Sequence, residues 1–225
     1  MDNTVFSYIF KKCPEISRRE VMRYAGIKGN IPENAEKDIL SCILEVEKTA
    51  SPKACYMRVP VRITGKIVDF GFFRTESEKL AVNLKNTAEA FLFAVTVGTG
   101  VDRLINRYSA LSPVKALYFQ AAGAAAVESV CDYLCDKVFP DIIGEEKGLK
   151  PRFSPGYGDL SISVQKEFIN LLDCHRKIGL YLTDGNMMVP TKSVTAIAGI
   201  TNAKESCKYG CENCENWDCE FRGKG

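Results

Sequence analysis

The sequence contains a single histidine, His175, among its 225 residues. Without a second imidazole, a zinc site built on several histidines is excluded. Most hydrolytic mechanisms also lose their usual base, because histidine is the side chain that most often moves protons near neutral pH. The sequence supports neither a glycosidase-like carboxylate pair, nor a Ser/His/Asp triad, nor a Walker motif. We therefore do not expect a hydrolase.

Long apolar runs and charge runs of one sign are also missing. No apolar segment reaches the ~20 residues that a membrane-spanning helix needs. Lys and Arg number 30 and Asp and Glu number 28, and they are well mixed, so we expect neither a nucleic-acid nor a membrane partner. At the N-terminus, Asp2 precedes a short apolar run and basic residues follow it, the wrong order for a secretory signal. We expect a cytoplasmic protein.

Ten cysteines are present, and four of them crowd the C-terminal tail. In a cytoplasmic protein we expect reduced thiols or metal ligands rather than disulfides. The tail spacing C-x3-C-x2-C-x4-C allows four thiolates to wrap a zinc ion or an iron–sulfur cluster. We predict a metal site at Cys207, Cys211, Cys214 and Cys219 and leave the metal open. Free tail cysteines and a disulfide-linked redox switch are the alternatives.

The hydrophobic periodicity predicts an α+β fold with a mixed or antiparallel sheet flanked by helices. The apolar stretch 90–97 is typical of a central strand covered on both faces. Helices are expected at 17–25, 32–47, 77–84 and 101–108, from 112 onward, and from Ser161 or Ser163 through Leu172. Further strands are expected at 56–63, 66–73, 180–183 and 193–200. We divide the chain into an N-terminal helical segment (1–52), a core (53–203) and a short Cys-rich tail (204–225).

Two of these helices carry specific expectations. Ser17 and Glu20 have the form of a capping box at the start of the first one. In the second, an apolar stripe formed by Ile39, Leu40, Ile43, Leu44 and Val46 should pack against the rest of the protein.

Residues 151–159, PRFSPGYGD, which we call the PGY loop, carry more backbone constraints than an ordinary connection. Pro155 fixes one φ angle, and Gly156 and Gly158 permit positive φ on either side of Tyr157. Arg152 offers a planar fork of donors for a carboxylate or a phosphate, and Tyr157 offers a flat face with a polar tip. A well-made turn before a helix is the alternative interpretation.

The longest expected helix begins at Ser112 and Pro113, and its middle, 121–126, is nearly free of large side chains. A neighbouring element or a ligand can approach its backbone closely there. Glu128 follows about one turn later in a largely apolar stretch, near whatever packs on this surface. A solvent-facing glutamate is the alternative. Together, Arg152, Glu128 and Tyr157 would suit a small zwitterionic ligand.

The PGY loop, followed by Val189-Pro190-Thr-Lys-Ser193-Val194-Thr-Ala-Ile, resembles the S-adenosylmethionine-binding activation domain of cobalamin-dependent methionine synthase. The resemblance covers about residues 55–200, including Val97-Gly-Thr-Gly-Val-Asp102 and the alanine-rich helix up to Glu128. The chain looks most like the stand-alone versions found in bacteria whose synthase lacks this domain.

The resemblance implies roles for four residues. Arg152 would hold the methionyl carboxylate of S-adenosylmethionine, and Gly156 would lie along the ligand. Tyr157 would face the corrin and its incoming partner module, and Glu128 would lie near the ligand's amino group. The family's aromatic pair after the last strand and its N-terminal acidic contact have no clear match here, so the adenine and ribose contacts are not assigned.

The resemblance also implies an accessory subunit rather than a self-sufficient enzyme. It would reactivate methionine synthase by supporting the reductive methylation of cob(II)alamin. Because the sequence lacks a D-x-H-x-x-G corrinoid-binding signature, the cobalamin should arrive on a separate core synthase. A flavodoxin or ferredoxin could supply the electron, and a cluster in the tail could relay it. The alternatives are a docking or sensor protein that has lost the ligand, and a reductive activator of another corrinoid methyltransferase.

Overall fold

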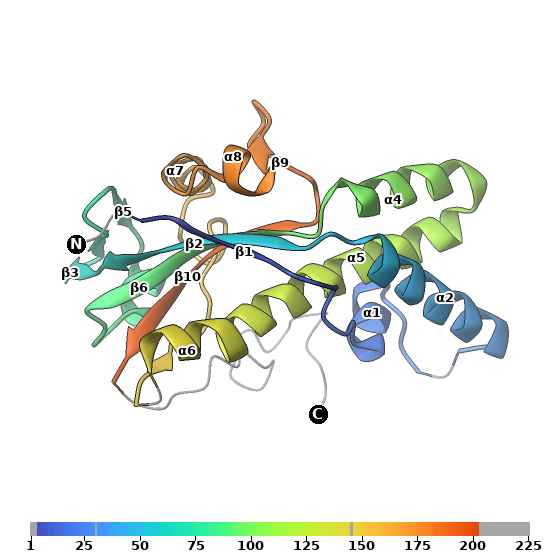
Figure 1. Cartoon of the computed structure of the whole chain (residues 1–225), viewed down its shortest axis with the longest axis horizontal. Helices are drawn as coiled ribbons and strands as arrows, with labels where there is room; N and C mark the ends of the chain where they lie inside the picture. The colour runs from blue at the N-terminus through green and yellow to red at the C-terminus, as the bar shows by residue number, and fades with distance from the viewer. Residues whose placement is uncertain (1–3, 30, 145, 203–225) are drawn as a thin grey trace.

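The computed structural model describes residues 4–29, 31–144 and 146–202. At its centre lies a five-stranded sheet in the order β1-β2-β6-β10-β7, in which every neighbouring pair is antiparallel (Figure 1). The strands are β1 (Phe6–Ile9), β2 (Lys53–Pro60), β6 (Glu89–Thr96), β7 (Gly148–Leu149) and β10 (Ser193–Thr201). The predicted α+β class, with helices flanking the sheet, is confirmed.

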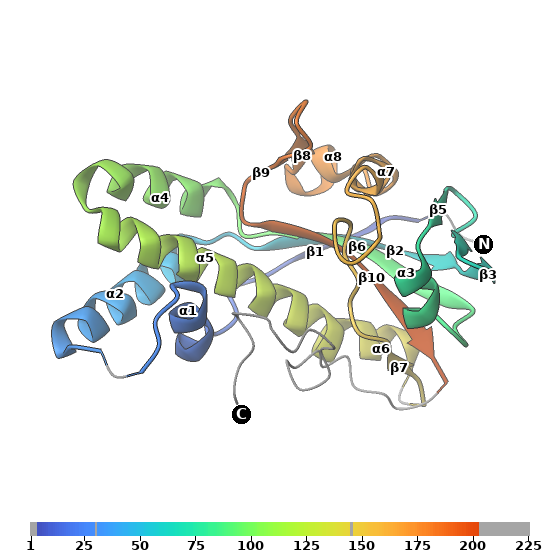
Figure 2. The ribbon, with the colours of Figure 1, turned by 180° about the vertical axis from the view of Figure 1, so that it is seen from behind.

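Helices and two small sheets cover the faces of this sheet (Figures 1 and 2). One face carries α1 (Arg18–Tyr24), α2 (Glu33–Thr49), α4 (Thr99–Leu111), α5 (Pro113–Tyr133), the π-helix η1 (Leu134–Val138) and α6 (Phe139–Ile143). The other carries α3 (Glu78–Asn83), α7 (Val164–Leu171), α8 (Cys174–Ile178), the sheet of β3 (Arg62–Thr64), β4 (Ile67–Asp69) and β5 (Arg74–Glu76), and the pair β8 (Tyr181–Leu182) and β9 (Met188–Val189).

Strand β6 supplies side chains to both faces. Phe91, Phe93 and Val95 join the hydrophobic cluster beneath α5, whereas Leu92 and Ala94 join the cluster beneath α7 and α8. Successive residues of a strand point to opposite sides, so a strand covered twice must be apolar throughout. The prediction of a central strand at 90–97 is confirmed.

Helix α5 is the longest element, at 21 residues, and it begins where the sequence predicted. The Ser112 hydroxyl accepts a hydrogen bond from the Lys115 amide at 3.4 Å. The small residues in its middle allow close packing: a Cβ at Gly123 would lie 2.9 Å from Val101 of α4 and 3.1 Å from Lys192. Over the described residues, no helix is long and apolar enough to cross a bilayer.

The N-terminal residues differ from the sequence-based expectation. Phe6–Ile9, predicted to lie in a helical segment, form β1 and pair with residues 53–56 of β2. Four residues are too few to show a periodicity, and the strand owes its conformation to a partner far along the chain. In α2, Leu40 and Leu44 were expected to be buried but are 42% and 54% exposed.

Candidate functional site

Arg152 lies at the edge of the central sheet, where its segment runs beside β10. The Lys150 amide donates to the Gly199 carbonyl at 2.7 Å, and Phe153 exchanges two backbone hydrogen bonds with Ile197, at 2.8 and 2.9 Å. The Phe153 side chain enters the cluster beneath α7. Because neighbouring residues of an extended segment point to opposite sides, Arg152 projects toward α5.

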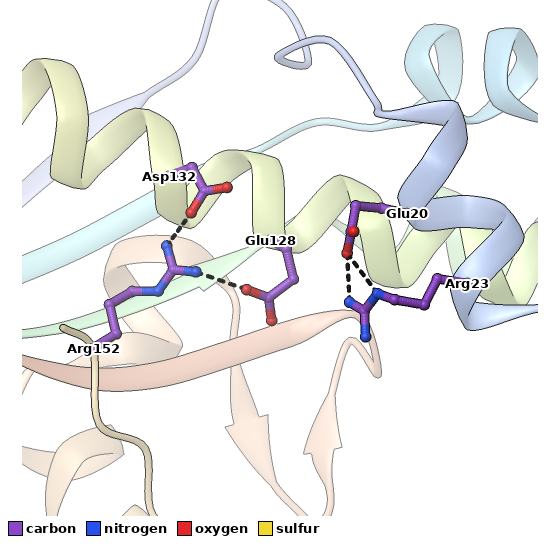
Figure 3. Close-up of polar contacts among 5 residues, drawn as sticks. All are labelled: Glu20, Arg23, Glu128, Asp132 and Arg152. Atoms are coloured by element: carbon purple, nitrogen blue, oxygen red, sulfur yellow. Dashed lines mark hydrogen bonds and ion pairs between the residues drawn. The ribbon is translucent and has the colours of Figure 1, made fainter. Parts of the chain in front are cut away.

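The Arg152 guanidinium bridges two carboxylates of α5 (Figure 3). Its Nη2 donates to Glu128 Oε2 at 2.9 Å, and its Nη1 donates to Asp132 Oδ1 at 2.6 Å. The two acidic residues are four positions apart and therefore share one face of the helix. The structure thus brings together Arg152 and Glu128, which the sequence had singled out, and adds Asp132, which it had not.

Helix α1 brings a second arginine–carboxylate pair to the same place, so that Glu20 and Arg23 lie beside Glu128 (Figure 3). Ser17 accepts a hydrogen bond from the Glu20 amide at 3.4 Å, as predicted. The Glu20 carboxylate, however, accepts from Arg23 Nε at 3.0 Å and does not close the expected capping box. The Arg23 guanidinium carbon lies 4.3 Å from the centre of the Tyr24 ring. The sequence did not predict that Glu20 and Arg23 would lie beside Glu128.

Burial and the charged side chains around Glu128 shift its pKa. Burial raises the pKa of Glu128 above the ordinary glutamate value, although the Arg152 guanidinium acts in the opposite direction. The carboxylates of Asp132 and Glu20 add to the increase, and Arg23 opposes it. A partly desolvated carboxylate of this kind is stabilised in its charged form by nearby cations.

The PGY loop is attached to α3 at both of its ends. The Asn83 side-chain amide donates to the Pro151 carbonyl at 3.1 Å. At the other end, the Asp159 carboxylate accepts from the Ser77 hydroxyl and, at 2.7 Å, from the first backbone amide of α3. The Ser77 bond and the α3 amides lower the pKa of Asp159, which keeps this carboxylate ionised. One short helix therefore holds both ends of the loop that carries Arg152.

The glycines of the loop use the freedom predicted for them, with φ of +86° at Gly156 and +59° at Gly158. A Cβ at Gly156 would lie 3.1 Å from the Ile162 side chain. Tyr157 is 52% exposed, and its ring packs edge-on against Phe153 with centroids 5.4 Å apart. Tyr157 therefore packs against the Phe153 ring, which points to the opposite side of the sheet from Arg152.

The predicted metal ligands Cys207, Cys211, Cys214 and Cys219 lie outside the described residues. Within the part of the chain that the structure describes, no group of three or more His, Cys, Asp or Glu side chains could hold a metal ion. The six described cysteines are all buried. The metal site stays a prediction.

A family model described as the vitamin B12-dependent methionine synthase activation domain matches residues 81–220, more than half of the chain. The chain belongs to this family. The resemblance drawn from the PGY loop is therefore confirmed. The matched part of this activation domain contains Glu128, Arg152, strand β10 and the four tail cysteines.

Solved structures agree with this assignment at the level of the fold. A crystal structure of the MetH reactivation domain bound to AdoHcy is similar to this chain with a TM-score of 0.65 and 15% sequence identity. The similarity covers 92% of this activation domain and 80% of the other chain. The comparison with curated proteins found no match.

Proposed function

We propose that this activation domain binds S-adenosylmethionine and supports the reductive methylation of cob(II)alamin carried on a separate core methionine synthase. The observation that carries the proposal is the 2.9 Å contact between Arg152 and Glu128. The amino-acid end of a ligand needs a cation and an anion side by side, and these two residues supply both. A ligand of this class also occupies the related reactivation domain, which was crystallised with AdoHcy.

In the proposed complex, the methionyl carboxylate takes the Arg152 fork and the ammonium group meets Glu128. A guanidinium suits a carboxylate because its planar donors match the two oxygens. Gly156 lies along the ligand, where the lack of a side chain leaves the backbone accessible. The exposed Tyr157 faces the corrin and the module that carries it.

The chemistry requires little acid–base assistance from the protein. One electron reduces cob(II)alamin to cob(I)alamin, whose electron pair attacks the methyl carbon of the sulfonium. The carbon–sulfur bond breaks with its electrons remaining on sulfur, which yields methylcobalamin and S-adenosylhomocysteine. Because the methyl donor is already activated, the protein contributes proximity and orientation. This role suits an accessory subunit and a chain with a single histidine.

The partner in this proposal is the corrinoid-binding module of a separate core synthase, and a cytoplasmic flavodoxin or ferredoxin supplies the electron. Cys207, Cys211, Cys214 and Cys219 would hold an iron–sulfur cluster, which would supply one-electron transfer. Zinc in the same four-thiolate site would make the tail a structural element instead.

A reconstituted methylation reaction tests the proposal. The core synthase in its cob(II) state is mixed with a reductant and methyl-labelled S-adenosylmethionine, with and without this chain, and label transfer and the visible spectrum are followed. We expect transfer to require the wild-type chain and to be lost with Arg152→Ala. Arg176→Ala, which removes an exposed arginine of α8, is the matched control and should retain transfer. Methylation of another corrinoid protein, but not of the core synthase, would contradict the proposal.

A further inference from the structure

Five charged side chains meet where α1, α5 and the PGY loop come together (Figure 3). Glu20 pairs with Arg23, and Arg152 pairs with both Glu128 and Asp132. Two guanidinium groups therefore face three carboxylates. The cluster carries one negative charge in excess.

Asp132 is the carboxylate that supplies this excess. Arg152 is already matched by Glu128, so Asp132 adds a second anion to the same guanidinium. The Asp132 side chain is 63% exposed, compared with 38% for Glu128. Exposed ion pairs are weak and exchange readily. An incoming carboxylate can therefore replace Asp132 at the Arg152 Nη1 atom while Glu128 remains in place for an ammonium group.

We propose that Asp132 makes this site select a ligand of net positive charge, and so favours the sulfonium S-adenosylmethionine over its neutral thioether product. The inference rests on the proposed function and adds a basis for discriminating substrate from product. The zwitterionic end of either ligand uses Arg152 and Glu128 and leaves the charge of Asp132 unbalanced. Only the substrate brings a further positive charge to this place.

In the proposed complex, the sulfonium is close enough to the cluster for its positive charge to interact with Asp132. Two methylene groups separate the sulfur from the carbon that bears the carboxylate and the ammonium group. That separation is shorter than the screening length of ~8 Å at physiological ionic strength. In the proposed complex the ligand carboxylate takes Arg152 Nη1, the atom that Asp132 contacts at 2.6 Å, so the sulfonium would lie within range of the displaced Asp132 carboxylate and would attract it.

Methyl transfer ends this attraction. The electron pair of the broken carbon–sulfur bond stays on sulfur, so the ligand loses its positive charge. The released Asp132 carboxylate then competes again for Arg152 without any compensating attraction. The product is held less tightly than the substrate, which favours its exchange for a new methyl donor.

Calorimetric titrations with S-adenosylmethionine and S-adenosylhomocysteine, on wild-type protein and on Asp132→Asn, test the inference. Asparagine keeps the size of the side chain and removes its charge. We expect wild-type protein to bind the substrate more tightly than the product, and we expect the variant to reduce this preference by about two- to fivefold. The product affinity should rise, because its competitor is weakened, while the substrate affinity changes less. Asp136→Asn, which removes an exposed charge in η1, should leave the preference unchanged.

The outcomes separate this inference from the proposed function. If wild-type protein binds both nucleosides and Asp132→Asn leaves their affinity ratio unchanged, the selection role of Asp132 is overturned and the proposed function stands. If folded wild-type protein binds neither nucleoside, alone or with the core synthase, the proposed function is overturned and this inference falls with it.

Discussion

The guanidinium of Arg152 lies 2.9 Å from the carboxylate of Glu128, although the two residues come from different layers of the protein. Arg152 reaches this position because its segment pairs with β10 and directs alternate side chains to opposite sides of the sheet edge. Glu128 reaches it from α5, whose small residues permit close packing against α4 and against Lys192, just before β10. The pair is therefore a product of the fold rather than of a local motif.

Replacement of Glu128 by glutamine should weaken S-adenosylmethionine binding by about 10- to 100-fold, because the ligand's ammonium group loses a charged acceptor. Glutamine retains the size of the side chain and one hydrogen-bond acceptor, so the protein should fold normally. Calorimetry measures the affinity, and thermal melting checks the fold. An unchanged affinity would show that the ammonium group binds elsewhere.

The pH dependence of binding should also report on Glu128. Burial raises the pKa of Glu128, so its carboxylate takes up a proton at a higher pH than an ordinary glutamate, whose pKa is about 4.3. Affinity should be full above the raised pKa and should fall as the pH drops through it. Titrations across a pH series would show this decline in wild-type protein and not in Glu128→Gln. Parallel curves for the two proteins would rule out this role.

Asp159→Asn should reduce stability at neutral pH by weakening the attachment of the PGY loop to α3. Hydrogen bonds from Ser77 and the α3 amides lower the pKa of Asp159 in the folded protein. A lowered folded-state pKa means that the stabilisation is present above the unfolded pKa of about 3.9 and is lost as the pH falls through the folded-state value. The difference in stability between wild type and variant should shrink on acidification.

Denaturant unfolding at several pH values measures this difference. Asp184→Asn, in an exposed turn, serves as the control and should change stability little at any pH. A difference for Asp159→Asn that stays constant down to strongly acidic pH would contradict the electrostatic account of the loop attachment.

Gly156→Ala should destabilise the protein by about 1–2 kcal/mol, because alanine pays a steric cost at positive φ. The φ angle of Gly156 is +86°, and the nearest side-chain atom belongs to Ile162, which is 47% exposed and can move aside. The cost should therefore resemble that of Gly26→Ala, where φ is +70° and no other atom crowds the position. Urea unfolding compares the two. A negligible cost at Gly156 would show that the loop does not need this backbone conformation.

The Cys-rich tail should bind a metal in anaerobically purified protein. We expect iron with acid-labile sulfide, and we expect Cys211→Ser to lose it, because the site needs four thiolates. Metal analysis and the visible spectrum give the result. Zinc without iron would refute the electron-relay role while keeping the metal site, and protein without any metal would refute both.

Much of the fold could be predicted from the sequence where local signals are strong. Strand β6 is apolar throughout, and α5 begins with Ser112 and Pro113, so both were correctly placed. Strand β1 could not be recognised, since its pairing partner lies in β2. The exposure of Leu40 and Leu44 was missed because the buried face of α2 is chosen by its packing against other helices.

The candidate site could be predicted only in part. The chemistry of Arg152 and the position of Glu128 indicated a charged pair, and the structure brings them together. Asp132 carried a usable signal, because it lies one turn from Glu128 on the same helix. Glu20 and Arg23 carried none, because only the packing of α1 against α5 brings them near.

The central claim is that Arg152 holds the carboxylate of S-adenosylmethionine, and calorimetric titration of the wild-type protein beside Arg152→Ala tests it most directly. We predict that wild-type protein binds the ligand, that Arg152→Ala binds it about 10- to 100-fold more weakly, and that Arg176→Ala binds it as wild type does. Equal binding by wild type and Arg152→Ala would contradict the claim. So would a folded wild-type protein that fails to bind the ligand both alone and in the presence of the core synthase.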